Sequence, residues 1–458
     1  SSYIVRGFFG NFYPYLLWSL LDFESVGITR FFNYFVILLN KILLLFIALK
    51  IAILSDFKTT KKIIFYFVLS ITLLIFTSYH SPIFFLRSFL LLFFILIIIN
   101  FITFEKNRLI NINIIGLLSS ISMFWYLDIG IYINLIIFLI FVFFIVKKEF
   151  KYLLNLFFSV SLGWIILIFL IPENEFNEFL KNTKSILLTI DYIHGLIFPT
   201  PFLSQDSRSI KALLLFLITG FFIITAINKV ENFNLKFLLV ISVLFLISII
   251  YFKYGLSRSD SGHIRGATGF LYIPFFSFLF FKLIKLFPNS KINFSKKINL
   301  LLYSFLIVIF FSTTLINKKF ESKSISNFIS SKENILKLLR YPDESYINED
   351  YQKLVSYYKN LSKSDPCTMI FTHESAIPYF LKKNTCSKYF FMYTATPKEI
   401  QNNIMKDLNN NKPIFLIYKS DIDAYGHVGD RLKILNKYIL DRYSFYEKFK
   451  HWEIYKLK

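Results

Sequence analysis

Residues 83–104 read IFFLRSFLLLFFILIIINFITF, an almost unbroken apolar run. An α-helix needs about 20 apolar residues to cross the hydrocarbon core of a bilayer. Comparable runs recur along the chain, and we predict membrane-spanning helices at ten places. These are residues 31–54, 63–78, 83–104, 112–127, 129–146, 152–171, 210–228, 235–252, 268–287 and 299–317.

The composition agrees with a polytopic membrane protein. Of the 458 residues, 55% are hydrophobic and 59 are Phe. The formal net charge is +22, but the basic residues are spread over the turns and the C-terminal part, without the cluster that a nucleic-acid-binding surface requires. We therefore expect the chain to lie in a lipid bilayer and to bind no nucleic acid.

Lys and Arg are concentrated in alternate turns, at 55–62, 105–111, 147–151, 229–236 and 288–297. By the positive-inside rule, these turns are cytoplasmic. The opposite turns, residues 1–30 and everything after about residue 318 then face outward. The unusual polar residues of the chain fall on that outward side.

Four parts follow from this division: an outward amphipathic loop at 1–30, a transmembrane domain at 31–317, a linker at 318–344 and an extracytoplasmic domain at 345–458. In the last part, strand-like runs alternate with helical stretches, which predicts a small α/β domain with a mostly parallel sheet. The predicted strands are 367–372, 387–393, 412–419 and 451–457, and the predicted helices lie near 349–361, 374–383, 397–410 and 428–442. The predicted fold class is thus a membrane all-α polytopic bundle of about ten transmembrane helices, some short or broken, followed by a small C-terminal α/β domain.

The two cysteines, Cys367 and Cys386, stand at the starts of the first two predicted strands. The starts of adjacent parallel strands lie about 5 Å apart, which is within reach of a disulfide, and an outward compartment would permit the bond. Two unpaired thiols are the equal alternative. Two Cys without nearby paired His do not make a metal site, so we assign no metal ligands and leave a divalent-metal requirement open.

The densest group of ionisable residues is LSRSDSGHIR at 256–265, between two apolar runs. Ionisable groups at the edge of a bilayer are costly, which makes them functional candidates. Arg258 and Arg265 offer planar forks that suit phosphate, and His263 could bind the same phosphate or shuttle a proton. Asp260 could orient either. The alternative is an interfacial loop whose charges pair among themselves and with lipid headgroups.

Two further carboxylates join Asp260 as candidates for a catalytic role. Asp128 lies between two short apolar runs, where capping of a helix is the alternative function. Asp191 lies three residues before His194 in the long loop 172–209, which we interpret either as a re-entrant segment or as a surface loop with an amphipathic helix. Arg208, at the end of this loop, is a further candidate for binding phosphate.

The layout resembles that of the GT-C superfamily of integral-membrane glycosyltransferases, which use polyprenyl-phosphate-linked sugars. The resemblance rests on GNFYPYLLW at 10–18, then Gly27 and Arg30 before the first span, together with the many spans and the C-terminal α/β domain. Where the superfamily has an Arg-Asp pair, this chain has Arg6 and Gly7. Since the chain begins with Ser1 rather than Met, we expect either that the catalytic base lies upstream or that this is a divergent member.

The resemblance implies hexosyl or pentosyl transfer from a polyprenyl-phosphate sugar to a glycan, lipid or protein acceptor, at the outer face of a bacterial inner or plasma membrane, with no other cofactor certain. A carboxylate would activate the acceptor hydroxyl, and cations would stabilise the departing lipid phosphate. For the cations we choose Arg258, His263 and Arg265, with Arg208 in reserve. The alternatives are a lipid-linked oligosaccharide ligase or polymerase, a transporter, and a non-catalytic membrane scaffold.

Overall fold

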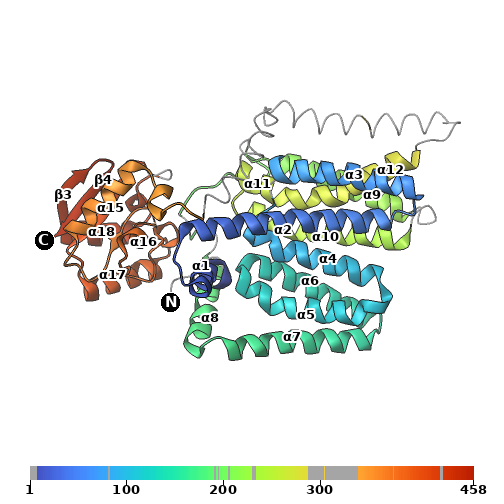
Figure 1. Ribbon diagram of the computed structural model, residues 1–458, viewed down its shortest axis with the longest axis horizontal. Helices are drawn as coiled ribbons and strands as arrows, with labels where there is room; N and C mark the ends of the chain where they lie inside the picture. Colours follow the sequence, from blue (N-terminus) through green and yellow to red (C-terminus); the bar gives the residue numbers. More distant parts are fainter. Residues whose placement is uncertain are drawn as a thin grey trace.

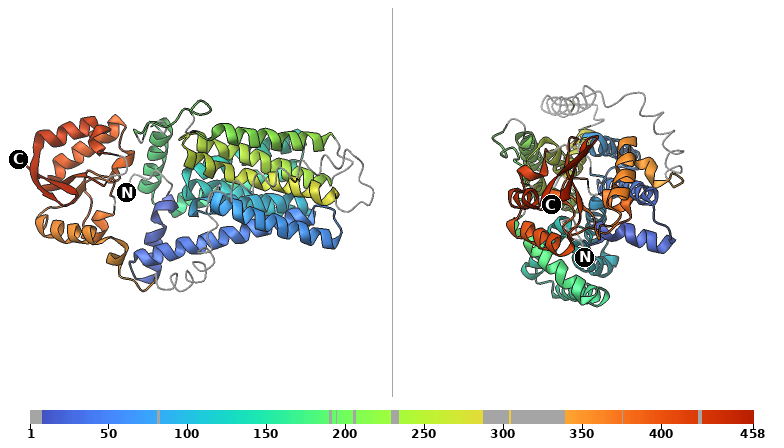
Figure 2. Two further views of the ribbon diagram at one scale, coloured as in Figure 1. Left: turned by 90° about the horizontal axis from the view of Figure 1, so that it is seen from above. Right: turned by 90° about the vertical axis from the view of Figure 1, so that its left-hand side faces the viewer.

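The computed structural model describes residues 8–80, 83–189, 192–193, 195–204, 207–228, 234–286, 304, 339–374, 376–422 and 426–458. Within them, a bundle of long helices is followed by a small C-terminal domain with a four-stranded sheet (Figure 1). The C-terminal domain lies beyond one end of the bundle, which we call the domain-facing end. A view from above shows α1 (Phe8–Leu21) and α8 (Glu173–Thr189) between the two parts (Figure 2).

The described residues contain nine helical segments that are long and apolar enough to cross a membrane, as is typical of an integral membrane protein. They match nine of the ten predicted spans, and the tenth, 299–317, lies outside the described residues except for residue 304. The first of them starts inside the predicted loop 1–30. The segments are α2 (Val26–Ile53), α3 (Thr59–Ile75) with η1 (Phe76–His80), η2 (Leu86–Ser88) with α4 (Phe89–Thr103), η3 (Glu105–Asn107) with α5 (Arg108–Trp125), α6 (Leu127–Val146), α7 (Phe150–Leu170), α9 (Ser209–Ile227), α10 (Leu235–Leu256), and α11 (Ser261–Thr268) with η5 (Gly269–Leu271) and α12 (Tyr272–Leu286).

Small residues allow α5, α6 and α7 to pack closely. A Cβ added to Gly130 in α6 would lie 2.4 Å from the Cα of Met123 in α5, and one added to Gly116 in α5 would lie 2.5 Å from the Cβ of Ser159 in α7. The close approach at Gly130 fixes the start of α6 against the end of α5. Asp128 belongs to that start.

The polar turns separate into two ends of the bundle. At the end far from the C-terminal domain, Lys236 pairs with Glu105 at 3.3 Å and the Asn234 side chain donates to Asp56 at 2.8 Å. These residues come from the turns that the positive-inside rule groups together. The turns of the other group, α8 and the start of α11 lie at the domain-facing end (Figure 1).

The C-terminal sheet has the strand order β1-β2-β4-β3, with β1 (Met369–Ile370), β2 (Phe415–Ser420), β3 (Tyr443–Phe449) and β4 (Trp452–Leu457). Helices cover both faces, as an α/β domain requires. Apolar side chains of α15 (Glu349–Leu361) and α16 (Ile377–Leu381) pack on one face, and those of α17 (Lys398–Asn411) and α18 (Lys433–Arg442) on the other.

The expectation of a mostly parallel sheet was wrong. Only β1 and β2 are parallel, whereas β4 pairs antiparallel with both β2 and β3. The predicted strand at 387–393 does not form, because the only bridge nearby among the described residues joins Thr385, before this segment, to Thr368. The missed strand, β3, joins β4 in a hairpin whose turn contains Lys450 at φ 53°.

The bridge between Thr368 and Thr385 brings the neighbouring Cys367 and Cys386 together. The structure joins them in a disulfide, with Cα atoms 4.9 Å apart. This confirms the predicted disulfide and excludes the alternative of two unpaired thiols. The bond ties β1 to the segment that leads towards α17.

The C-terminal domain docks on the bundle through polar and apolar contacts. The backbone N–H of Val26 donates to Asp343 at 2.8 Å, and Lys388 pairs with Glu178 of α8 at 2.7 Å. One cluster of buried apolar side chains includes Ile186 of α8 and Ile193 together with residues of β1, β2, α17 and α18. The long loop 172–209 thus begins with the amphipathic helix α8, which carries part of this interface.

Candidate functional site

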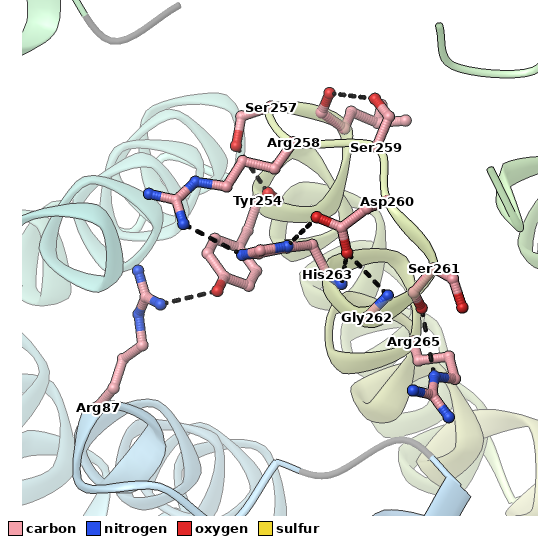
Figure 3. Close-up of polar contacts among 11 residues, drawn as sticks. Arg87, Tyr254, Ser257, Arg258, Ser259, Asp260, Ser261, Gly262, His263 and Arg265 are labelled. Carbon is pink, nitrogen blue, oxygen red and sulfur yellow. Dashed lines mark hydrogen bonds and ion pairs between the residues drawn. The ribbon is translucent and has the colours of Figure 1, made fainter. Parts of the chain in front are cut away.

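The ionisable run at 256–265 folds into the end of α10, a short turn and the first two turns of α11. Asp260 is the N-cap of α11, since its Oδ1 accepts from the backbone N–H groups of Gly262 at 2.8 Å and His263 at 3.0 Å (Figure 3). Burial opposes ionisation of the Asp260 carboxyl, but the hydrogen bonds from His263 and Gly262 outweigh it and hold the pKa below its usual range. The carboxylate therefore stays charged and starts the helix.

His263 lies between Asp260 and Arg258 (Figure 3). Its Nδ1 is 2.5 Å from Asp260 Oδ2, and its Nε2 is 3.3 Å from Arg258 Nη1. A guanidinium only donates, so Nε2 accepts from Arg258 and the ring proton is on Nδ1. Asp260 thereby fixes both the orientation and the tautomer of the imidazole and leaves Nε2 directed at the arginine.

A second charged pair adjoins this group. Arg87, in η2, forms an ion pair with Asp128 in the first turn of α6. Arg87 Nη1 also donates to the Tyr254 hydroxyl at 2.9 Å, and the guanidinium lies 4.3 Å from the centre of that ring. Tyr254 meets His263 ring edge to face at 5.9 Å, so this tyrosine joins the two groups.

We call Arg87, Asp128, Tyr254, Arg258, Asp260 and His263 the charged cluster. Its charged and imidazole side chains are partly exposed: 28% for Arg87, 23% for Asp128, 37% for Asp260 and 26% for His263. The cluster is therefore partly open to a ligand. The cluster lies at the domain-facing end of the bundle, where η2, α6, α10 and α11 meet.

Neither Arg265 nor Arg208 makes one of the contacts that hold the cluster together. Arg265 bonds back to the Ser261 carbonyl at 3.3 Å, and residues two apart on a helix do not share a face, so it lies away from His263 (Figure 3). Arg208 is exposed at the start of α9, where its backbone carbonyl accepts from Ala212 N–H at 3.2 Å, and its side chain forms no hydrogen bond or ion pair within the part of the chain that the structure describes. Asp191 and His194 lie outside the described residues.

Of the two carboxylates Asp128 and Asp260, it is Asp260 that caps a helix. Asp128 does not cap α6, whose N-cap is Tyr126, and its carboxylate meets Arg87 instead. Asp260, considered as an orienting group, is both orienting group and cap. Arg87 was missed, although an arginine inside the apolar run 83–104 is the kind of costly charge that signals a site.

The loop that follows α8 approaches the cluster and the C-terminal domain at once. Arg258 lies 6.0 Å from the centre of the Phe198 ring. Gly195, at φ 60°, comes so close to the domain that an added Cβ would lie 2.9 Å from Thr396 Oγ1. This loop therefore couples the position of the domain to the surroundings of Arg258.

The described residues hold no group of three or more His, Cys, Asp or Glu side chains that could bind a metal ion. The chemistry available to the cluster is that of two guanidinium groups, one imidazole, one phenol and two carboxylates. The chain matches no protein-family model and no curated protein sequence.

Proposed function

We propose that the chain is an integral-membrane glycosyltransferase, which moves a sugar from a polyprenyl-phosphate carrier to an acceptor at the domain-facing end of the bundle. The observation that carries the proposal is the charged cluster itself. Two arginines and a histidine converge at one end of a bundle whose helices are long enough to cross a membrane. A lipid phosphate presents its charge at that depth.

Arg258 and His263 are the proposed phosphate ligands. Arg258 Nη1 and His263 Nε2 are 3.3 Å apart, so one phosphate oxygen could accept from both once it replaces their mutual contact. The negative charge of the phosphate would favour the second ring proton that such a contact needs, while Asp260 holds Nδ1 in place. Arg265 lies on the other side of α11 and is not one of the proposed phosphate ligands.

Asp128 is the proposed general base. In the transfer step the acceptor oxygen bonds to the anomeric carbon while the bond from that carbon to the phosphate oxygen breaks. The proton of the acceptor hydroxyl passes to Asp128, and the lipid phosphate leaves with its negative charge. Arg87, which orients Asp128, and Arg258 would stabilise that charge as it develops.

The topology in this proposal follows the positive-inside rule. The turns with Lys236 and the residues near Glu105 are cytoplasmic, and the domain-facing end and the C-terminal domain are extracytoplasmic. A bacterial plasma membrane supplies polyprenyl-phosphate carriers at that outer face. The disulfide between Cys367 and Cys386 supports an oxidising location for the C-terminal domain.

Binding of polyprenyl phosphate to the full chain in lipid nanodiscs tests the site. We expect Arg258→Ala to weaken binding about tenfold, since a charge-assisted hydrogen bond is worth roughly 1.5–3 kcal/mol. Arg265→Ala is the matched control, with the same residue type in the same helix region, and should bind as the wild type does. Equal binding by the two variants would contradict the phosphate site.

Transfer of labelled sugar from polyprenyl phosphate tests the reaction. Asp128→Asn should lower the rate by about 10²–10⁴, the usual contribution of a general base. Asp260→Asn keeps a capping side chain on α11 and should reduce the rate much less. If Asp128→Asn transfers sugar at the wild-type rate, Asp128 is not the base.

A further inference from the structure

A wide groove separates α8 and the turn before α2 from the C-terminal domain. It has a volume of about 1100 Å³ and is lined by residues of α8, α16, α17 and the segment around Cys386. Cavities for drug-sized ligands measure about 300–1,000 Å³, so this groove has room for an oligomer rather than for a single small molecule. It is distinct from the charged cluster, none of whose residues line it.

The groove is predominantly basic. Its lining includes five lysines and three acidic residues: Lys181, Lys382, Lys383, Lys388, Lys406, Glu24, Glu178 and Asp407. Two of the acids are already paired, in Lys382–Glu24 at 3.3 Å and Lys388–Glu178 at 2.7 Å. Both pairs join the C-terminal domain to the bundle, so they hold the walls of the groove in place.

The third acid, Asp407, accepts from the neutral Ser387 hydroxyl at 2.6 Å and forms no ion pair among the described residues. Three lysines of the lining also form no ion pair there. Lys383 donates to the Ser362 carbonyl, which leaves Lys181 and Lys406 for a ligand. Lys181 on α8 and Lys406 on α17 are exposed, and neither belongs to an ion pair among the described residues. They stand on the two opposite sides of the groove, one on the bundle and one on the domain.

The rest of the lining suits sugar units. Tyr389 is buried, and the Tyr379 ring lies between Trp18 and Lys382. The half-buried Phe390 ring remains, and aromatic faces pack against the C–H groups of a pyranose. Asn384 and Asn403 present amides, which both donate and accept hydrogen bonds as sugar hydroxyls require. An acidic peptide would need the lysines but would gain little from this ring and these amides.

We infer that the groove binds an acidic glycan, a linear sugar chain that carries carboxylate or phosphate groups. Lys181 and Lys406 bind its charges, and Phe390 and the amides bind its sugar units. The glycan is the acceptor of the transfer reaction, a role that rests on the proposed function, whereas the binding itself does not. The docked C-terminal domain thus supplies one wall of the acceptor site.

The test measures binding of a labelled oligogalacturonate to the full chain in detergent micelles, beside an uncharged galactose oligomer of the same length. We expect the double variant Lys181→Glu and Lys406→Glu to bind the acidic oligomer at least about tenfold more weakly than the wild type. The matched control is Lys184→Glu and Lys398→Glu, which reverses the same charges on the same two helices outside the groove. The control should stay within about twofold of the wild type, and binding should weaken as salt is added.

Equal affinity of the two double variants for the acidic oligomer would overturn the inference. So would equal affinity of the wild type for the acidic and the uncharged oligomer, or tighter binding of an acidic peptide such as oligoglutamate. The same variants are also tested with polyprenyl phosphate, whose binding should not change. If Arg258→Ala retains full polyprenyl-phosphate binding while the groove variant loses the acidic oligomer, the proposed function fails and the groove remains a glycan site.

Discussion

The close approach of α5 and α6 at Gly130 allows a quantitative test of how the cluster is held. In Gly130→Ala, the new Cβ would lie 2.4 Å from Met123 Cα and 2.6 Å from Met123 N, where ordinary contacts begin at 3.4 Å. Both neighbours are backbone atoms, so no side chain can rotate away. The two helices would have to separate by about 1 Å.

Overpacking of this kind costs roughly 1–3 kcal/mol. Alanine returns up to about 1 kcal/mol through its higher helix propensity. We therefore expect a net loss of stability of about 1–2 kcal/mol, seen as a lower unfolding midpoint of the full chain in detergent. Because Asp128 belongs to the same turn of α6, the shift should also lengthen its contact with Arg87 and lower the transfer rate.

Gly220→Ala is the matched control for this substitution. Gly220 lies in α9, and an added Cβ would meet only the Phe245 ring, at 3.3 Å from Cζ. The end of an aromatic ring can yield by a few tenths of an ångström, and alanine adds the same helix propensity here, so the midpoint should equal or exceed that of the wild type. If Gly130→Ala unfolds at the same temperature as Gly220→Ala, the close approach of α5 and α6 does not constrain the cluster.

Three further predictions concern the helix cap, the disulfide and the loop after α8. Asp260→Ala should destabilise the chain by about 1 kcal/mol through loss of the cap. The pKa of Asp260 is lower in the folded state than in the unfolded state, so the stability that its ionisation adds is present above about pH 4 and is lost as the pH falls through the folded-state pKa. Asp260→Asn should remove this part of the pH dependence of the unfolding midpoint. Replacement of both Cys367 and Cys386 by Ser should cost about 3 kcal/mol, because the bond closes a loop of 19 residues, and an unchanged midpoint under reducing conditions would contradict this. Gly195→Ala should loosen the docked domain, since φ is 60° and Thr396 is too close, which increased proteolysis of the loop 195–204 would report.

Apolar periodicity located the helices well, because each span depends on its own composition more than on its neighbours. The cluster at 258–263 was also accessible from sequence, since its charges are contiguous along the chain. Arg87 could have been suspected from its charge inside an apolar run, but its partners could not, because only the fold brings it to Asp128 and Tyr254.

The C-terminal sheet shows the limit of local patterns. Residues 387–393 are rich in aromatic residues, as strands are, but a strand also needs a partner, and the only bridge nearby among the described residues joins Thr385, before this segment, to Thr368, before β1. β3 was missed although four of its seven residues are aromatic, because they do not alternate regularly with polar residues and most of this edge strand is exposed. The groove could not be predicted at all, since its lining comes from segments far apart in the chain.

The contacts that dock the C-terminal domain also set the order in which the molecule is assembled. Val26 binds Asp343, and Glu24 binds Lys382, across 317 and 358 positions of the chain. The first helices leave the ribosome long before these partners are made. Both the groove and the apolar contacts of Ile186 and Ile193 with the C-terminal domain therefore form only when synthesis is nearly complete. A chain that terminates early would carry a finished bundle with an exposed apolar end, a feature by which cellular quality control distinguishes incomplete copies from complete ones.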